Sequence, residues 1–181
     1  MDRATAYELA KSSFSNRNLF KHVLAVEAVM RELAEYFNDD IEKWGLAGLL
    51  HDLDYEETAN DPDRHTLVTE DLLKPYSLDP EIIKAIKCHN DKAPRNQLIG
   101  KAIYAADPVT GLIVAAALMH PDKKLKSLDS DFILRRFKEK RFAAGANREQ
   151  ILTCEDFGLS LESFLAIALR AMQRIDKELG L

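Results

Sequence analysis

Apolar residues recur along most of this chain at intervals of three and four residues, the spacing that places them on one face of an α-helix. The clearest such stretch runs from Leu19 to Phe37 and carries His22 near its start. No run of alternating β-branched residues indicates a strand, and the seven glycines and six prolines are thinly spread. The pattern therefore predicts an all-α fold.

A second helix is expected from about Ile41 to Leu50. Its last five residues, Leu46-Ala47-Gly48-Leu49-Leu50, are apolar on every side, and the polar pair His51-Asp52 follows at once. Because the apolar end of this helix must be buried, we expect it to carry His51 and Asp52 into the interior.

Two Asp-Pro pairs resemble helix starts, with an acid at the N-cap and proline at the first helical position. Asp61-Pro62 predicts a helix that runs to about Leu73 and contains His65. Asp79-Pro80 predicts a helix that ends near His89.

The stretch from Leu98 to Leu118 is the most apolar in the chain, and Asp107-Pro108 interrupts it. Proline in a helix removes a backbone donor, so Pro108 is expected to bend or restart the helix. Asp107 has no polar neighbour in this stretch, and the nearest basic residue in sequence is Lys101. A distant arginine is one candidate partner for its carboxylate, and a metal ion is the other.

The last third of the chain predicts packing helices. Asn147 resembles an N-cap, with Gln150 three residues later, and a final helix is expected from Ser160 to about Leu179. The stretch from Lys123 to Arg141 is rich in lysine and arginine. We favour a solvated face for it, and a rim that guides anions is the alternative.

Length and composition are typical of one ordinary globular domain. The chain has 181 residues, 46% hydrophobic and 30% charged, with a net charge of -5. The acidic balance argues against a sequence-wide attraction to nucleic acid or to anionic membranes. Two cysteines, Cys88 and Cys154, are too few for a disulfide scaffold and are expected to be free, buried thiols. The first residues lack a secretory signal and no uncharged run is long enough to span a membrane, so we expect a cytoplasmic protein.

Four of the five histidines and two aspartates fall in or beside apolar helical segments. Burying ionised carboxylates costs several kcal/mol unless they are paired or coordinate a metal ion. Imidazole and carboxylate together suit iron, manganese, zinc and similar divalent ions. The set comprises His22, His51, His65, His89, Asp52 and Asp107.

The order of these residues resembles that of the HD-domain superfamily of metal-dependent phosphohydrolases. The resemblance covers roughly Leu19 to Leu118 and rests on an early histidine, Leu49-Leu50-His51-Asp52 and Ala105-Ala106-Asp107. It implies a single HD-like helical bundle, with a metal-binding core at about 19–118 and a helical extension at about 119–181. By this resemblance His22, His51, Asp52 and Asp107 would hold a first metal ion.

Many members of that superfamily bind a second ion through two further histidines, and His65 and His89 occupy the matching places. The resemblance thus implies two divalent ions per chain, iron, manganese or similar, with Asp52 as the bridge. Metal-bound water held at Asp52 would then be the nucleophile. The alternative for His65 and His89 is a contact with substrate phosphate, or with the water on a single ion.

The chain also departs from the family pattern. Asp54 replaces a common glycine and Tyr55 a frequent lysine, and the Gly-Tyr-Pro signature of the cyclic dinucleotide phosphodiesterases is absent. Asp54, Glu56 and Glu57 are interpreted as exposed loop acids, the alternative being a proton donor or an anchor for a ligand. His120 lies outside the pattern and is expected at the surface.

The function that follows is hydrolysis of a phosphoester or phosphoanhydride of a small molecule, expected to be a nucleotide, with no nucleic acid or membrane as partner. A dinuclear iron oxygenase with the same ligands is one alternative, and a non-catalytic nucleotide sensor is another. A phosphoryl group needs cationic company, and the candidates for it are Lys87, Lys92, Arg64 and Arg148, each of which is otherwise a solvated surface residue.

Overall fold

The computed structural model describes residues 1–181 and contains helices and no strands, which confirms the all-α prediction. Three short 3-10 helices, η1 (Lys74–Tyr76), η2 (Leu125–Ser127) and η3 (Thr153–Phe157), join the α-helices. The α-helices are α1 (Arg3–Ser13), α2 (Arg17–Phe37), α3 (Ile41–Leu50), α4 (Tyr55–Thr58), α5 (Leu67–Leu73), α6 (Pro80–His89), α7 (Leu98–Met119), α8 (Ser130–Lys138), α9 (Arg148–Leu152), α10 (Leu161–Arg174) and α11 (Asp176–Leu179).

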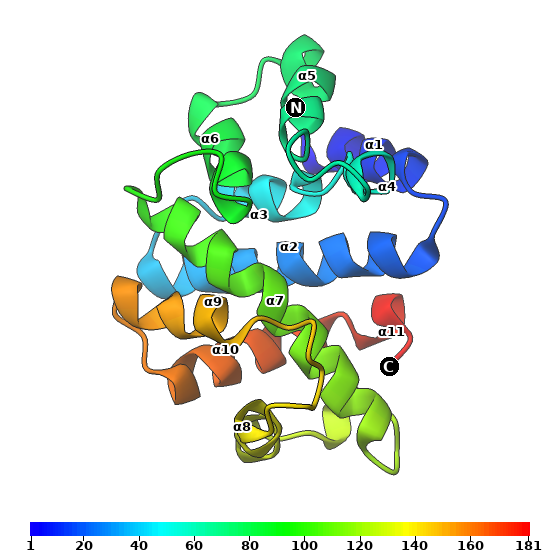
Figure 1. Ribbon diagram of the computed structural model, residues 1–181, viewed down its shortest axis with the longest axis vertical. Helices are drawn as coiled ribbons and strands as arrows, with labels where there is room; N and C mark the ends of the chain where they lie inside the picture. The colour runs from blue at the N-terminus through cyan, green and yellow to red at the C-terminus, as the bar shows by residue number, and fades with distance from the viewer.

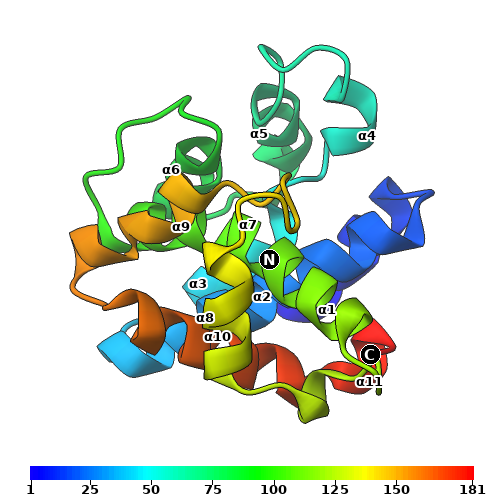
Figure 2. The same ribbon diagram turned by 60° about the horizontal axis from the view of Figure 1, so that its bottom comes forward.

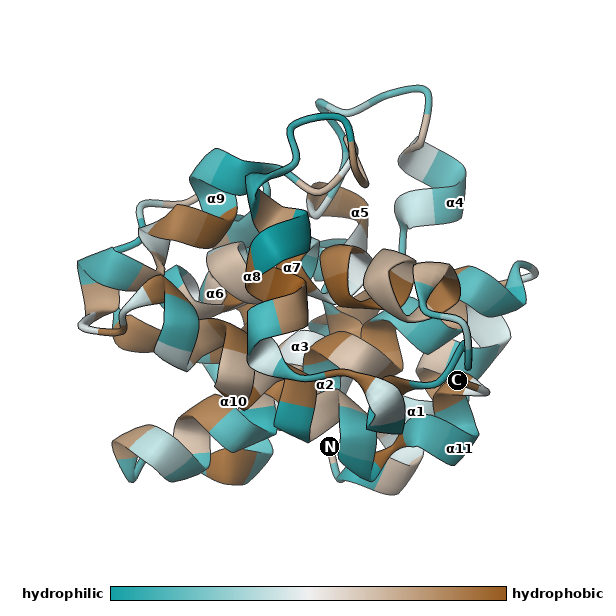
Figure 3. Cartoon of the chain, turned by 90° about the horizontal axis from the view of Figure 1, so that it is seen from below, coloured by the Kyte–Doolittle hydropathy of each residue, from teal (hydrophilic) through white to brown (hydrophobic).

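Two long helices, α2 and α7, form the centre of the molecule and cross one another (Figure 1). Helices α3 and α6 pack on one side of this pair, and α10 packs on the other. Helix α8 and the segment after it lie against α7 (Figure 2). Apolar side chains from every α-helix except α4 join in one continuous core, and the ribbon of α7 is largely hydrophobic (Figure 3).

Several helix boundaries are those that the sequence predicts. Helix α3 ends at Leu50, and both His51 and Asp52 are buried directly after it. Asp79 accepts a hydrogen bond from the backbone N–H of Glu81 and begins α6, which ends at His89. Asn147 likewise caps α9 through its side chain. Both cysteines are free and buried, as expected.

The prediction of a helix from Asp61-Pro62 is wrong. Residues 62–66 form consecutive turns, and α5 begins only at Leu67. His65 therefore lies in a turn, and Thr66 after it has a left-handed backbone with a φ of 70°. In this turn, Nδ1 of His65 lies 2.7 Å from Oδ1 of Asp54.

The structure also decides two other boundaries. Of the two effects expected of Pro108, a bend or a restart, the restart does not occur, because Pro108 lies inside a continuous α7. The final helix is divided instead, because α10 ends at Arg174 and α11 begins at Asp176. Helix α7 is long and apolar enough to cross a membrane by length and composition alone, but 56% of that window is buried inside the structure. One helix of this kind is weak evidence for a membrane span.

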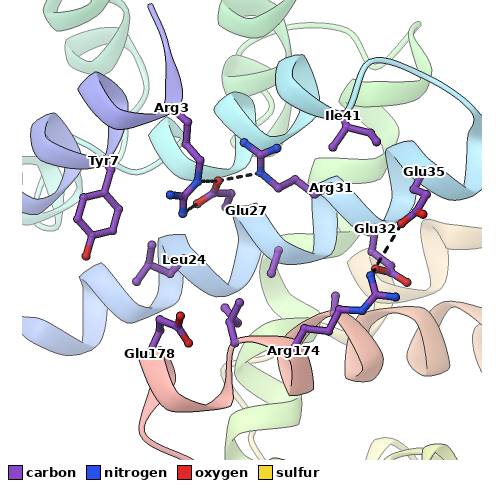
Figure 4. A pocket seen from close by; sticks show the side chains of 13 residues that line it. Arg3, Tyr7, Leu24, Glu27, Arg31, Glu32, Glu35, Ile41, Arg174 and Glu178 are labelled. Atoms are coloured by element: carbon purple, nitrogen blue, oxygen red, sulfur yellow. Dashed lines mark hydrogen bonds and ion pairs between the residues drawn. The ribbon is translucent and has the colours of Figure 1, made fainter.

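Two buried glutamates on α2 tie neighbouring helices to it. Arg3 of α1 and Arg31 of α2 both bind Glu27, and Arg174 of α10 binds Glu32 (Figure 4). Arg170 of α10 also binds Glu32. Glu27, Glu32 and their partners Arg3, Arg31 and Arg174 line a cavity of about 490 Å³ between α1, α2 and α10. Ion pairs account for all of its charged side chains except Glu178, and several of these pairs join neighbouring helices.

Gly48 sets the distance between α3 and α2. A Cβ atom at this position would lie 2.9 Å from the backbone N and Cα of Glu27. The absence of a side chain thus lets the end of α3 reach α2 closely and places His51 and Asp52 beside His22.

We expect Gly48→Ala to lower the free energy of unfolding by about 1–3 kcal/mol, because the backbone of α2 must move away from the added methyl group. Gly111→Ala on the exposed side of α7 is the matched control, since a Cβ there meets no atom within 4 Å. The control should be more stable than the parent by about 0.5–1 kcal/mol. Urea unfolding measures both, and equal stabilities would contradict this account of α2–α3 packing.

Candidate metal centre

The six side chains singled out in the sequence come together at one place in the structure. They reach it from five different parts of the fold: α2, the end of α3, the turn before α5, α6 and α7. The ligand atoms of His22, His51 and Asp107 lie within 4.8 Å of one another, as do those of His51, Asp52 and His89. His65 completes the cluster, with its Nε2 atom 3.3 Å from Oδ1 of Asp52.

The carboxylate of Asp52 divides the cluster into two halves. Its Oδ2 atom faces Nε2 of His51 at 3.4 Å and Nε2 of His22 at 3.7 Å. Its Oδ1 atom faces Nε2 of His65 and Nε2 of His89, each at 3.3 Å. One carboxylate thus presents one oxygen to each pair of histidines.

Asp107 belongs to the first half. Its Oδ1 atom lies 3.0 Å from Nε2 of His22 and 3.9 Å from Nε2 of His51. No lysine or arginine forms an ion pair with Asp107 or with Asp52, so the distant arginine considered from the sequence is not present.

Each histidine is held through its Nδ1 atom. Carbonyl oxygens accept this N–H in two cases, from His51 to Gly48 at 2.8 Å and from His89 to Ile86 at 2.5 Å. His65 donates to Asp54. The Thr110 hydroxyl donates to the carbonyl of Asp107 and so accepts from Nδ1 of His22 at 3.1 Å. With the proton on Nδ1, all four neutral imidazoles present the Nε2 lone pair to the centre.

The lone pairs directed inward fit a cation. Nε2 of His51 is buried and has no hydrogen-bond partner. Nε2 of His65 and Nε2 of His89 lie 3.0 Å apart, and each lies 3.3 Å from Oδ1 of Asp52. A divalent ion satisfies such nitrogens and the adjacent carboxylates together. The residues present therefore fit the metal ions that the sequence resemblance implies.

The charges of the cluster shift several pKa values. Burial raises the pKa of the Asp52 carboxyl, but the imidazoles around it outweigh burial and hold that pKa well below its usual value. Burial lowers the pKa of His65, whereas its hydrogen bonds and attraction to Asp52 and Asp54 raise it to about 9. The pKa of His22 is raised against its burial by Asp107. Before a metal ion binds, protons occupy part of the centre.

The interpretation of Asp54 as an exposed loop acid is wrong. Only 2% of it is exposed, and its two carboxylate oxygens accept from Nδ1 of His65 at 2.7 Å and from the N–H of Thr69 at 2.9 Å. Asp54 thus orients His65 and joins it to α5. Its replacement of the usual glycine was the signal in the sequence that this position has a role of its own.

Glu56 and Glu57 are exposed, as predicted, and each binds a neighbouring group. Glu56 accepts hydrogen bonds from the backbone N–H groups of Ser15 and Asn16, just before α2. Glu57 pairs with Arg64 at 2.9 Å. His120 lies at the end of α7 near Asp122, outside the cluster.

The structure pairs the four cationic candidates with other groups. Arg64 binds Glu57, Lys87 binds Glu70 at 2.7 Å, and Lys92 lies 3.6 Å from Asp63. Arg148 donates to four backbone carbonyls, of residues 137, 142, 143 and 146, and thereby shapes the segment before α9. None of the four forms a hydrogen bond or an ion pair with a residue of the cluster.

The cluster opens to solvent on one side. The side chains of His51 and His89 are 0% and 4% exposed, whereas those of His22 and Asp107 are 24% and 29% exposed. A cavity of about 320 Å³ lies over this edge and is lined by His22, Asp107, Pro108, Gly111, Ala143, Gly145 and Ala146. A ligand can therefore reach the centre from the side of α7 and the segment that Arg148 shapes.

Comparison with known proteins identifies the class. The family model described as HD domain matches residues 19–117, more than half of the chain, so this chain belongs to the HD domain family. The match coincides with the extent of the resemblance found from the sequence. Divalent metals are what HD domains bind, and the histidine and aspartate clusters are able to hold them.

Curated proteins similar to this chain include several that are named Ribonuclease Y. The protein from Nitratidesulfovibrio vulgaris strain DP4 is 33% identical over 101 residues, which are 56% of this chain and 19% of the relative. That from Geobacter metallireducens is 24% identical over 172 residues, 93% of this chain and 33% of the relative. The chain thus spans a fifth to a third of these relatives. No solved structure matches it significantly.

We expect metal binding to release protons and to strengthen as pH rises. A histidine binds metal only when neutral, and a pKa of about 9 means that His65 of the metal-free protein is protonated at pH 7. The affinity for Mn²⁺ should therefore increase from pH 6.5 to 8.5 and level off above about 9. Calorimetric titration in buffers of different ionisation enthalpy counts the protons, and an affinity independent of pH would oppose this prediction.

Asp54→Asn should weaken metal binding about 10- to 100-fold. An amide has one acceptor oxygen where the carboxylate has two, so it cannot accept from both His65 and Thr69. Glu57→Gln, an exposed acid three residues later, is the control and should bind Mn²⁺ like the parent. If both variants bind Mn²⁺ equally well, Asp54 does not position His65.

Proposed function

We propose that this chain is a metal-dependent phosphohydrolase that cleaves a phosphoester or phosphoanhydride with a metal-activated water. The observation that carries the proposal is the position of the Asp52 carboxylate, which offers one oxygen to each of two histidine pairs. A carboxylate between two ligand sets is suited to bridge two divalent ions, and two-ion centres are common among enzymes that hydrolyse phosphate esters.

Six residues would hold the ions. His22, His51 and Asp107 would serve the first, His65 and His89 the second, and Asp52 both. Divalent ions at such a centre lower the pKa of bound water and neutralise charge on a phosphoryl group. Iron or manganese suits this mixture of imidazole and carboxylate.

The chain's own residues supply position and access. The backbone carbonyls of Gly48 and Ile86 fix the rings of His51 and His89, and Asp54 fixes the ring of His65. These three histidines form the floor, with side chains at most 12% exposed, so a phosphate ester enters over the more exposed edge at His22 and Asp107. Burial of the floor excludes bulk water from the side opposite the substrate.

The substrate we propose is a nucleotide, either free or within RNA. The relatives are named ribonucleases, which supports hydrolysis over oxygen chemistry on the same ligands and opposes our expectation that nucleic acid is not a partner. A local basic surface agrees with this, although the net charge is -5. Lys138, Lys140 and Arg141 are exposed, have no acidic partner, and precede the segment that lines the cavity over the centre.

The test is replacement of Asp52 by Asn. An amide has one oxygen and cannot ligate on both sides, so Asp52→Asn should lose at least one metal ion per chain and about 10³-fold or more in turnover. Turnover is assayed with bis(p-nitrophenyl) phosphate, mononucleotides and a short oligoribonucleotide, and metal is counted by elemental mass spectrometry.

His120→Ala is the control for this experiment and should keep both metal and turnover, since His120 lies outside the cluster. The parent, purified without oxygen or chelators, should contain about two ions per chain. A single ion in the parent would assign His65 and His89 to substrate binding. Full turnover by Asp52→Asn would overturn the proposal.

A further inference from the structure

The open edge of the metal centre continues as a groove along α7. The cavity of about 320 Å³ over the centre and a second cavity of about 450 Å³ share two lining residues, His22 and Gly111. From Asp107 the groove follows Gly111, Val114 and Leu118, residues spaced by four, three and four positions. This spacing places them on one face of the helix, and eleven residues at a rise of 1.5 Å span about 16 Å.

This face of α7 is not covered by another helix near the centre. Gly111 is exposed, and a Cβ atom there would meet nothing within 4 Å. Leu118 at the far end is 52% exposed, although most of α7 is buried. The floor of the groove is therefore apolar, open at Gly111, and directly continuous with Asp107.

One wall of the groove carries a free cation. Lys21 and Asn18 of α2 line the second cavity together with His22. Lys21 is half-buried, forms no ion pair, and has its Nζ atom 3.1 Å from the place that a Cβ of Gly180 would occupy. It thus lies between the metal centre and the residues of α11, with its charge unneutralised by any acidic side chain.

We propose that this groove binds the nucleoside that follows the scissile phosphate and that Lys21 contacts the next phosphate along. This inference rests on the proposed function and narrows its substrate to an oligonucleotide, in preference to a phosphate of one small group. Val114 and Leu118 offer apolar surface to a base or sugar, and Lys21 offers charge to a phosphate. At about 16 Å along α7, the groove is longer than a single small phosphate ester needs. Gly111 determines specificity, because any large side chain there closes the groove beside Asp107.

The test compares Gly111→Leu with the parent, both loaded with Mn²⁺. The probe is tetraadenylate with phosphorothioate linkages and a 3′-fluorescein, whose binding is read by anisotropy. Gly111→Leu should raise the Kd for this probe about tenfold or more, because its side chain fills the groove. Binding of inorganic phosphate, which needs only the centre, should change less than about twofold.

Lys21→Ala tests the second contact and should raise the Kd for tetraadenylate about three- to tenfold, and weaken its salt dependence, by removing one charge opposite a phosphate. Lys11→Ala is the matched control, since Lys11 is an exposed and unpaired lysine on α1. Far-ultraviolet circular dichroism verifies that each variant is folded.

The outcomes separate the groove from the hydrolase proposal. No binding of tetraadenylate by the parent, or equal Kd values for the parent and Gly111→Leu, would overturn the groove. Turnover of bis(p-nitrophenyl) phosphate by the parent tests hydrolysis independently. Loss of binding in Gly111→Leu and in Lys21→Ala, without any turnover by the parent, would keep the groove and reject the hydrolase.

Discussion

The interior of this protein is organised around one buried carboxylate. Asp52 cannot remain ionised in an apolar core without compensation, and four imidazoles from separate segments of the chain surround its two oxygens. Positioning them requires α3 to end against α2, which Gly48 permits by its lack of a side chain. The turn before α5 and the end of α6 must then reach the same point. The fold is in this sense a frame that converges on Asp52.

Most of the fold and the six clustered residues could be predicted from the sequence. Helical periodicity identified α2, α3 and α7, because an apolar stripe is a local property of each segment. Asp107 stood out for a similar reason, as an acid with no polar neighbour in the most apolar stretch of the chain. The order of histidines and aspartates supplied the rest through the family resemblance, which the HD domain match to residues 19–117 confirms.

What the sequence did not yield depends on contacts between distant segments. An Asp-Pro pair predicted a helix from Pro62, but the contact of His65 with Asp54 is satisfied by a turn, and tertiary contacts override local preference. Asp54 resembled Glu56 and Glu57 as a loop acid, because nothing in a linear pattern distinguishes the acid that turns inward. Likewise, Arg148 gave no sign that its partners would be four backbone carbonyls.

The ends of two helices give the centre a further electrostatic property. His51 follows the last residue of α3 and His89 is the last residue of α6, so both helices direct the partial negative charge of their C-terminal ends toward the two carboxylates. Such a field attracts cations and repels a phosphate group. Under the proposed function, metal ions would therefore have to enter first, and a phosphate ester would gain affinity only after their charge had reversed the local potential.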